Sequence, residues 1–248
     1  MNFLIKALKT VWLLFWTSFA LIIVFLPVMI FSIFSKTGNL AFKTAKIWAW
    51  ITIKATGVKL HKRNNDGVKN DRSYIIIANH QSLFDGLAIA LTLKNQFRWI
   101  AKKELKWVPL FGYALYATRN IFVDRSNLKK SIESINRGFQ RLPGDVSILF
   151  FAEGSRSGDG KVKEFKKGGF FMAVENGIPI LPITVNGSRK VLKKGDSAFN
   201  SGPIEVVVGD VIETAGLNTD DLDDLIKKTR DIIISNLDPH YPAEKPSL

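Results

Sequence analysis

The sequence predicts an α/β protein with a mixed, mostly parallel sheet flanked by helices, preceded by an N-terminal two-helix module that binds a membrane. Two observations predict the sheet. Short β-rich runs alternate with helical segments after about residue 58, and the runs are apolar along their length, as in strands covered on both faces. A third observation predicts the module, because residues 11–34 carry no charged side chain. The 248 residues suit one domain with an appendage, and we expect the module in residues 1–57 and the α/β domain in residues 58–248.

The first predicted helix contains the uncharged segment of residues 11–34. Its 24 residues would form a helix of about 36 Å, which is enough to cross the ~30 Å hydrocarbon layer of a bilayer. Lysines flank the segment on both sides, so the positive-inside rule gives it no direction. Pro27 would kink the helix, as a re-entrant path requires. We expect an anchor that dips into one leaflet, with a single spanning helix as the alternative.

The second predicted helix, at about residues 40–57, has the pattern of a helix that lies at a membrane surface. Lys43, Lys46, Lys54 and Trp50 fall near one helical face, and Gly57 is a predicted helix stop. Residues 1 to 60 hold seven lysines and no acidic residue. This basic bias on an apolar segment favours an anionic phospholipid leaflet over nucleic acid as the partner. We therefore expect the protein at the cytoplasmic face of the inner cell membrane, monotopic or with a single span.

The remaining elements alternate along the chain. Six β-rich runs are predicted strands, at residues 73–79, 97–102, 120–124, 146–152, 180–185 and 204–209. The predicted helices lie at residues 83–94, 109–117, 127–141, 168–176 and 219–236. Three polar clusters, "NHQSLFD", "DRS" and "EGSRSG", directly follow strands. If those strands are parallel, the clusters meet at one edge of the sheet, where α/β proteins bind ligands.

Several kinds of chemistry are excluded or disfavoured. The chain has no cysteine, and therefore no disulfide, thiolate metal site or cysteine nucleophile. Three scattered histidines without clustered acids do not predict a metal site, and His61 and His240 have no acidic partner placed on an element. "GSRSG" has Arg156 where a serine hydrolase needs its nucleophile, and "GSRSGDGKV" departs from P-loop spacing. We expect no bound cofactor.

His80 and Asp85 form the first candidate pair. In a strand-to-helix loop, the carboxylate would orient the imidazole and leave its other nitrogen free to accept a proton. The same spacing also fits a helix cap, with Ser82 as the N-cap residue and Asp85 three residues later. The spacing alone does not separate a catalytic pair from a cap, and one carboxylate can serve both roles.

Arg125 and Arg156 are candidate phosphate ligands, because each follows a predicted strand and a guanidinium binds phosphate through paired hydrogen bonds. The alternative is that they are solvated loop residues that pair with Asp124, Glu153 or Asp159. A surface ion pair of this kind stabilises the folded protein by only ~0 to 1 kcal/mol.

Two motifs in this first half of the domain resemble the glycerolipid acyltransferase family, most closely the bacterial 1-acyl-sn-glycerol-3-phosphate acyltransferases. The family's first motif, Asn-His followed by four residues and Asp, matches Asn79, His80 and Asp85. Its second motif, an apolar run that closes in arginine, matches residues 121–125.

Two further motifs follow in the family's order. The third, usually Phe-Pro-Glu-Gly-Thr-Arg-Ser, matches residues 151–157, with Ala152 and Ser155 in place of proline and threonine. The fourth, a repeated apolar-proline pair, matches residues 178–182. Four ordered motifs are far more specific than one. The resemblance covers roughly residues 60 to 210 and implies the fold of the glycerol-3-phosphate acyltransferases.

The resemblance implies an acyltransferase of phospholipid synthesis. His80, oriented by Asp85, would deprotonate the sn-2 hydroxyl of lysophosphatidic acid for attack on the thioester of acyl-coenzyme A or acyl carrier protein, giving phosphatidic acid. The residues expected to bind the phosphate or shape its loop are Arg125, Glu153, Gly154 and Arg156. Supporting residues are Asn79, Ser155 and Pro179.

Two other functions remain open on the sequence alone. The acceptor could be glycerol-3-phosphate, another lysophospholipid or an acylated amino acid, and activity with lysophosphatidylcholine but none with lysophosphatidic acid would indicate this. A non-catalytic lipid-binding protein is the other possibility, although the intact His80 and Asp85 argue against it.

Overall fold

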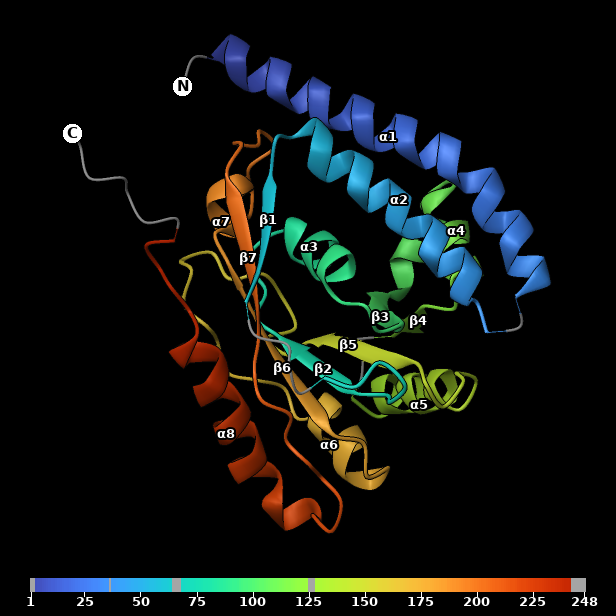
Figure 1. The fold of residues 1–248 in the computed structure, drawn as a ribbon, viewed down its shortest axis with the longest axis vertical. Coiled ribbons are helices and arrows are strands. Elements are labelled where there is room, and N and C mark those ends of the chain that lie inside the picture. Colours follow the sequence, from blue (N-terminus) through green and yellow to red (C-terminus); the bar gives the residue numbers. More distant parts are fainter. Residues whose placement is uncertain (1–2, 36, 64–67, 125–127, 242–248) are drawn as a thin grey trace.

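The computed structural model describes residues 3–35, 37–63, 68–124 and 128–241. A seven-stranded sheet forms the centre of the molecule, in the order β1-β7-β6-β2-β5-β3-β4 (Figure 1). β7 runs antiparallel to β6, and every other pair of neighbouring strands is parallel. The predicted mixed, mostly parallel sheet is therefore confirmed. The strands are β1 (Lys59–Arg63), β2 (Ile75–Ala78), β3 (Phe97–Lys102), β4 (Ile121–Val123), β5 (Ser147–Phe151), β6 (Ile180–Asn186) and β7 (Pro203–Val208).

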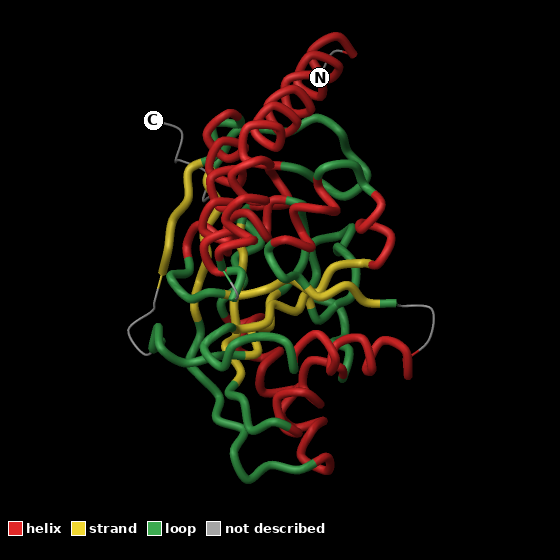
Figure 2. The backbone as a smooth tube through the Cα atoms, turned by 90° about the vertical axis from the view of Figure 1, so that its right-hand side faces the viewer, coloured by secondary structure: helices red, strands yellow, loops and turns green. Residues whose placement is uncertain are grey.

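Helices cover both faces of the sheet, as Figures 1 and 2 show. One face carries α1 (Phe3–Phe34), α2 (Asn39–Ala55), α3 (Phe84–Thr92) and α4 (Phe111–Ala117), with the short helices η1 (Lys103–Trp107) and α7 (Ser188–Val191) beside them. The other face carries α5 (Leu128–Phe139), α6 (Gly168–Glu175) and α8 (Leu222–Ser235), which η2 (Thr219–Asp221) precedes. Each predicted strand is present with its ends within two residues of the prediction, and each helix predicted after residue 58 is present with its ends within three.

The two faces of the sheet bury separate apolar cores. Along β2, Ile76 and Ala78 belong to the core beneath α2 and α3, while Ile75 and Ile77 belong to the core beneath α5 and α6. This is the period of two that a strand imposes, here with apolar side chains on both faces. Because β2 lies at the middle of the sheet, the chain that follows Ala78 enters the centre of one sheet edge.

The strand β1 is absent from the sequence prediction. Its sequence, Lys-Leu-His-Lys-Arg, lies at the edge of the sheet, and four of its five side chains are exposed. Charged residues are common on edge strands because they discourage pairing with other chains. The apolar pattern that identifies buried strands is therefore missing here.

The first two helices form an antiparallel pair. The indole N–H of Trp12 donates to the carbonyl of Ala55 at 2.7 Å, and that of Trp48 donates to the carbonyl of Thr17 at 2.9 Å. Gly57 has φ of 67°, a left-handed conformation that ends helices and favours glycine. The pair lies along one side of the α/β domain.

One detail of the amphipathic prediction for α2 is wrong. Lys46 does not share the exposed face with Lys43 and Lys54, because its ammonium group donates to the carbonyl of Leu93 at 3.1 Å on the domain side. Burial, followed by the nearby charge of Lys43, lowers the pKa of Lys46.

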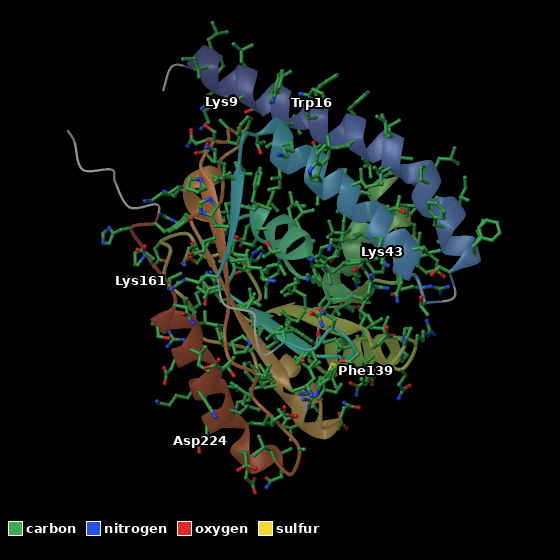
Figure 3. All side chains as sticks on the ribbon, viewed as in Figure 1. Lys9, Trp16, Lys43, Phe139, Lys161 and Asp224 are labelled. Atoms are coloured by element: carbon green, nitrogen blue, oxygen red, sulfur yellow. The ribbon has the colours of Figure 1, made fainter. Side chains whose placement is uncertain are left out.

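Helix α1 is the one helix of the described residues that is long and apolar enough to cross a membrane. Its outer side is lined by exposed large apolar side chains along its whole length, and Figure 3 shows them projecting away from the molecule. Near its N-terminus it is tied to the domain, since Lys6 pairs with Asp196 at 2.7 Å and Lys9 donates to Asn200 at 3.2 Å.

Candidate active site

His80 and Asp85 meet at the carboxyl end of β2. His80 lies in the loop between β2 and α3, and Asp85 lies in the first turn of α3. The Nδ1 atom of His80 is 2.8 Å from Oδ2 of Asp85. Because a carboxylate oxygen only accepts, Nδ1 carries the proton, and Nε2 is left free to accept one. The side chain of Asp85 is fully buried, whereas that of His80 is 19% exposed and lines a cavity.

Asp85 also reaches back to the loop before its helix, as in the capping box that the sequence suggested. The same Oδ2 atom accepts the backbone N–H groups of Gln81 at 2.7 Å and Ser82 at 2.8 Å. The hydroxyl oxygen of Ser82 accepts the N–H of Phe84 at 3.2 Å. The catalytic and capping interpretations of the sequence therefore describe one carboxylate with both sets of contacts.

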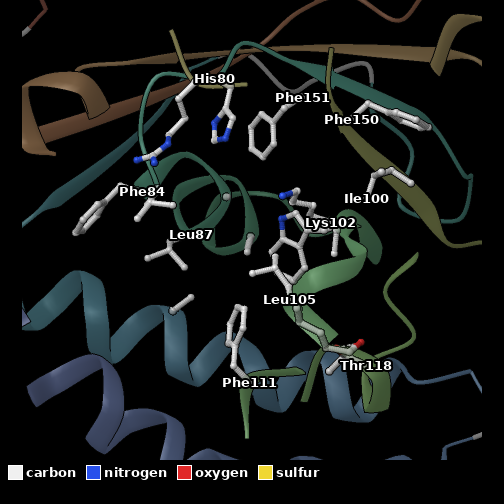
Figure 4. Close-up of a pocket in the computed structure, with 18 of the residues that line it drawn as sticks. His80, Phe84, Leu87, Ile100, Lys102, Leu105, Phe111, Thr118, Phe150 and Phe151 are labelled. Carbon is white, nitrogen blue, oxygen red and sulfur yellow. Dashed lines mark hydrogen bonds between the residues drawn. The ribbon is translucent and has the colours of Figure 1, made fainter. Parts of the chain in front are cut away.

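Phe151 packs against one face of the His80 ring. Its ring stacks on the imidazole of His80, with 3.9 Å between ring centroids and 15° between ring planes. Phe151 pairs with Ala78 across the parallel strands β5 and β2, which places it directly beside the loop that carries His80 (Figure 4). Sequence reasoning did not assign this role. The alignment of parallel strand ends is the signal that could have indicated it.

Glu153 supports the backbone of His80. One carboxylate oxygen accepts the N–H of His80 at 2.7 Å, and the other accepts the N–H of Lys163 at 3.1 Å. Burial raises the pKa of Glu153, and the two N–H groups partly oppose this rise. The carboxylate thus ties three segments together.

Further hydrogen bonds fix the loop that carries the histidine. The side chain of Asn79 accepts the N–H of Val185 at 2.7 Å and donates to its carbonyl at 3.1 Å. The N–H of Ser157 donates to the carbonyl of His80 at 2.8 Å. The backbone on both sides of the imidazole is thereby held by β6 and by the loop after β5.

Arg156 lies at the cavity with a half-buried side chain. The acids that the sequence suggested as its surface partners are engaged elsewhere, because Glu153 accepts backbone N–H groups and Asp159 accepts the N–H of Lys161 at 3.1 Å. The neighbouring Ser155 is exposed, and its hydroxyl accepts the ammonium group of Lys163 at 3.2 Å.

Gly154 has φ of 70°, and a Cβ atom there would meet the end of the Lys166 side chain at 2.8 Å. Glycine therefore leaves room for a second cation, Lys166, which also lines the cavity. Lys102, at the end of β3, lines it as well. Neither lysine was among the predicted site residues, although each follows a strand or precedes a helix at this edge of the sheet.

One predicted site residue is not described by the structure, and one lies away from this cluster. Arg125 lies outside the described residues. Pro179 precedes β6 at the opposite end of the sheet, where its carbonyl accepts the N–H of Ile75 at 3.0 Å.

The cavity beside His80 has a volume of about 1090 Å³, at the upper end of the ~300–1,000 Å³ typical of ligand pockets. Its walls are mainly apolar, and Figure 4 shows part of the lining. Apolar residues from helices α1 to α5 contribute, among them Leu13, Leu21, Val24, Leu87, Ala90, Phe111, Leu115 and Ile135. A base, several cations and a long apolar space thus occur in one cavity. This suits a ligand with an anionic head and an aliphatic chain.

Comparison with known proteins gives consistent matches. The Acyltransferase family model matches residues 59–186. The chain is 31% identical over 189 residues to an uncharacterized acyltransferase of Schizosaccharomyces pombe, covering 75% of this chain and 68% of that protein. It is 31% identical over 175 residues to the human 1-acyl-sn-glycerol-3-phosphate acyltransferase alpha, covering 70% and 62%. It is also 31% identical over 169 residues to the chloroplastic enzyme LPAT1 of Arabidopsis thaliana, but spans only 46% of its length.

The fold also matches a solved structure. The crystal structure of the 1-acyl-sn-glycerophosphate acyltransferase PlsC from Thermotoga maritima superposes with a TM-score of 0.79 and 23% identity, covering 98% of both chains. This likeness includes the long first helix as well as the sheet.

Proposed function

Because this chain belongs to the acyltransferase family, we propose that it transfers an acyl chain from a thioester to the sn-2 hydroxyl of 1-acyl-glycerol-3-phosphate, which gives phosphatidic acid. One observation carries the proposal: the His80–Asp85 pair faces an apolar cavity that Arg156 also lines. The names of the human and Arabidopsis relatives support the choice of acceptor.

His80 acts as the general base in this proposal. Nε2 takes the proton of the acceptor hydroxyl as its oxygen attacks the thioester carbonyl carbon. Asp85 Oδ2, 2.8 Å from Nδ1, stabilises the imidazolium that forms. When the tetrahedral intermediate collapses, the carbon–sulfur bond breaks and the imidazolium returns the proton to the thiolate. Base catalysis of this kind typically contributes ~10²- to 10⁴-fold in rate.

The phosphate of the acceptor binds to cationic side chains at the cavity. Arg156, Lys102 and Lys166 line the same space as His80. Hydrogen bonds from charged donors to a phosphate oxygen are worth ~1.5–3 kcal/mol each. Arg125 remains a predicted fourth ligand. The apolar walls accept an aliphatic chain, whose burial is favourable by ~0.8 kcal/mol per methylene group.

The acyl donor is the thioester of coenzyme A or of acyl carrier protein. The chain requires no metal or bound cofactor in this mechanism, because the histidine supplies the base and the thioester supplies the activated acyl group.

The protein works on the cytoplasmic face of the inner membrane, with α1 along one leaflet rather than across the bilayer. Two observations support the orientation of α1 along one leaflet. α1 packs against α2, and its first turns are tied to the α/β domain through Lys6 and Lys9. A spanning orientation would break the ties of Lys6 and Lys9, since Asp196 and Asn200 belong to the polar loops of the domain.

The acceptor is tested by initial rates of the purified full-length chain. Lysophosphatidic acid, glycerol-3-phosphate, lysophosphatidylcholine and an acylated amino acid are each offered with acyl-coenzyme A and with acyl carrier protein loaded with the same chain. We expect the highest kcat/KM with lysophosphatidic acid and one of the two donors. A higher kcat/KM with any other acceptor contradicts the proposed substrate, and acylation of none of them contradicts the proposed activity.

A further inference from the structure

A second apolar surface lies beside the first two helices. In the segment of η1 and α4, Trp107 is 81% exposed, Tyr113 62%, Tyr116 63% and Val108 42%. We call these four residues the aromatic ridge. Large aromatic side chains are usually buried, and a group of them on one surface marks an interaction site.

The composition of the ridge is that of a membrane interface. Tyrosine and tryptophan concentrate at the boundary between lipid and water, because the ring is apolar and its polar tip hydrogen-bonds with head groups. In the described part of the chain, neither the tyrosine hydroxyls nor the Trp107 indole N–H have a hydrogen-bond partner. The exposed Lys106 directly precedes Trp107, and a cation there suits anionic head groups.

The backbone holds the ridge in a fixed shape. Leu110 has φ of 60° and ψ of −51°, and the N–H of Phe111 donates to the carbonyl of Pro109 at 2.6 Å. This is a γ-turn of the rare, strained kind with positive φ. Such strain persists only where the surrounding structure enforces it, and it is concentrated at functional sites. A Cβ atom on Gly112 would collide with the carbonyl of Lys106, so η1 and α4 are in close backbone contact.

The segment that carries the ridge packs against α1. Ala114 and Ala117 of α4 pack with Val24 and Val28 of α1, in a small core that also includes α2. Figure 1 shows α4 beneath the first two helices, on the side of the sheet that they cover.

The opposite face of the same segment forms part of the cavity wall. Phe111 and Leu115 line the cavity, and Leu105 of η1 does so too. One short segment thus separates the cavity from the aromatic ridge. We propose that the aromatic ridge is a second membrane contact, which docks on an anionic phospholipid surface and holds this wall of the cavity at the level of the lipid head groups.

This inference deepens the proposed function, because a lipid acceptor would enter the cavity from that surface. Its first test does not depend on activity. The natural chain has no cysteine, so Trp107→Cys and the control Ile234→Cys can each be labelled at one site with a polarity-sensitive fluorophore. Ile234 is also exposed, at 39%, but lies on α8, which covers the other face of the sheet from α1 (Figure 1).

Full-length labelled proteins are mixed with vesicles of phosphatidylglycerol and phosphatidylcholine. We expect a blue shift of the label at position 107 and none at position 234. Vesicle binding without a shift at position 107 overturns the proposal, because α1 alone would then carry the contact. Equal shifts at both positions also overturn it, since they indicate non-specific adsorption.

A triple variant, Trp107→Ser with Tyr113→Ser and Tyr116→Ser, gives the second test. We expect about tenfold weaker partitioning into the same vesicles, because apolar contact area is lost. Ile234→Ser should partition like the wild type. Circular dichroism checks that the triple variant is folded, and the single variant Tyr113→Ser replaces it if it is not. A folded variant with unchanged partitioning overturns the proposal, whatever its acyltransferase activity.

Discussion

A single carboxylate oxygen, Oδ2 of Asp85, joins the candidate base to the helix that positions it. It is the acceptor for the His80 ring and for two backbone N–H groups of the same loop. The cap therefore fixes where the carboxylate lies, and the carboxylate fixes the orientation of the ring. The sequence left open whether Asp85 is a capping residue or the partner of His80, and its carboxylate makes both sets of contacts.

Asp85→Asn separates the two contributions. We expect kcat to fall by ~10²- to 10⁴-fold, because an amide does not stabilise the imidazolium. Asparagine keeps an oxygen that can accept the two backbone N–H groups, so the free energy of unfolding should fall by less than the ~0.5–2 kcal/mol that loss of a capping side chain costs. Steady-state kinetics and urea unfolding measure the two effects.

The matched control is Ser82→Ala, which removes the hydroxyl that accepts the Phe84 N–H but leaves the His80–Asp85 contact. It should lower stability while kcat stays near that of the wild type. If Ser82→Ala lowers kcat as much as Asp85→Asn does, the rate loss comes from the disturbed loop and not from the pair.

The raised pKa of Glu153 predicts that the stability of the folded protein depends on pH. Burial raises its pKa in the folded state above the ordinary value of 4.5. Between the two pKa values the folded protein binds more protons than the unfolded chain, so the stability contribution of this group falls as the pH rises.

The glutamine side chain of Glu153→Gln does not titrate. The variant also loses one hydrogen-bond acceptor, and this loss lowers the stability by the same amount at every pH. The stability of the wild type relative to Glu153→Gln should therefore decrease as the pH rises from about 4 to 7. Urea unfolding at several pH values measures the difference, with the exposed Glu175→Gln as control. A difference that stays flat, or grows with pH, would show that burial does not dominate at Glu153.

The sequence predicts residues that act through neighbours in the chain better than those that act across strands. The spacing of His80 and Asp85 is local, and a strand followed by a helix brings them together. Phe151 and Lys102 reach the site from β5 and β3 through strand order, which a single sequence does not specify. Pro179 belongs to a matching motif but lies at the other end of the sheet, because motif and site need not coincide in space.

At the scale of elements, buried strands and helices could be predicted because their apolar periods are strong. β1 could not, since an exposed edge strand has no such period. The inward side chain of Lys46 could not be predicted either, because its acceptor at Leu93 comes from the end of α3, a helix remote in sequence.

The turn between α1 and α2 depends on a buried arginine from β3. Arg98 donates to the carbonyl of Thr37 at 3.0 Å and to Oδ1 of Asn39 at 2.8 Å, and its guanidinium lies 4.9 Å from the centroid of the Phe42 ring. Burial lowers the pKa of Arg98 to about 10. This side chain fastens the helical pair to the sheet.

Arg98→Ala should lower the free energy of unfolding by ~2–5 kcal/mol, because it leaves a cavity and buried acceptors without donors. Arg119→Ala, at a nearby exposed arginine, should cost far less. Urea unfolding of both variants measures the effect. Equal losses in the two variants would mean that the buried hydrogen bonds do not fasten the turn.

At the scale of the whole molecule, the first two helices are part of the core as well as the predicted membrane anchor. Phe42, Ala49 and Ile53 of α2 belong to the same buried cluster as Phe84 and Leu87 of α3. The boundary between residues 57 and 58 remains a prediction from sequence. The contacts predict what happens if the chain is cut at this boundary.

A chain that begins at residue 58 would expose the part of the core that α2 covers. We expect it to aggregate or to lack a cooperative unfolding transition, because large exposed apolar patches promote association. Size-exclusion chromatography and thermal unfolding test this against the full-length chain in detergent. A monomeric, cooperatively unfolding fragment would show that the α/β domain is stable by itself.

The central claim is direct acyl transfer with His80 as the base. It is tested by a single-turnover experiment in which excess wild-type or His80→Ala protein reacts with a radiolabelled acyl thioester and lysophosphatidic acid. The wild type should convert the label to phosphatidic acid without any label bound to denatured protein, and His80→Ala should form the product ~10²- to 10⁴-fold more slowly. Undiminished product formation by His80→Ala, or a protein-bound acyl group that precedes the product, would contradict the mechanism.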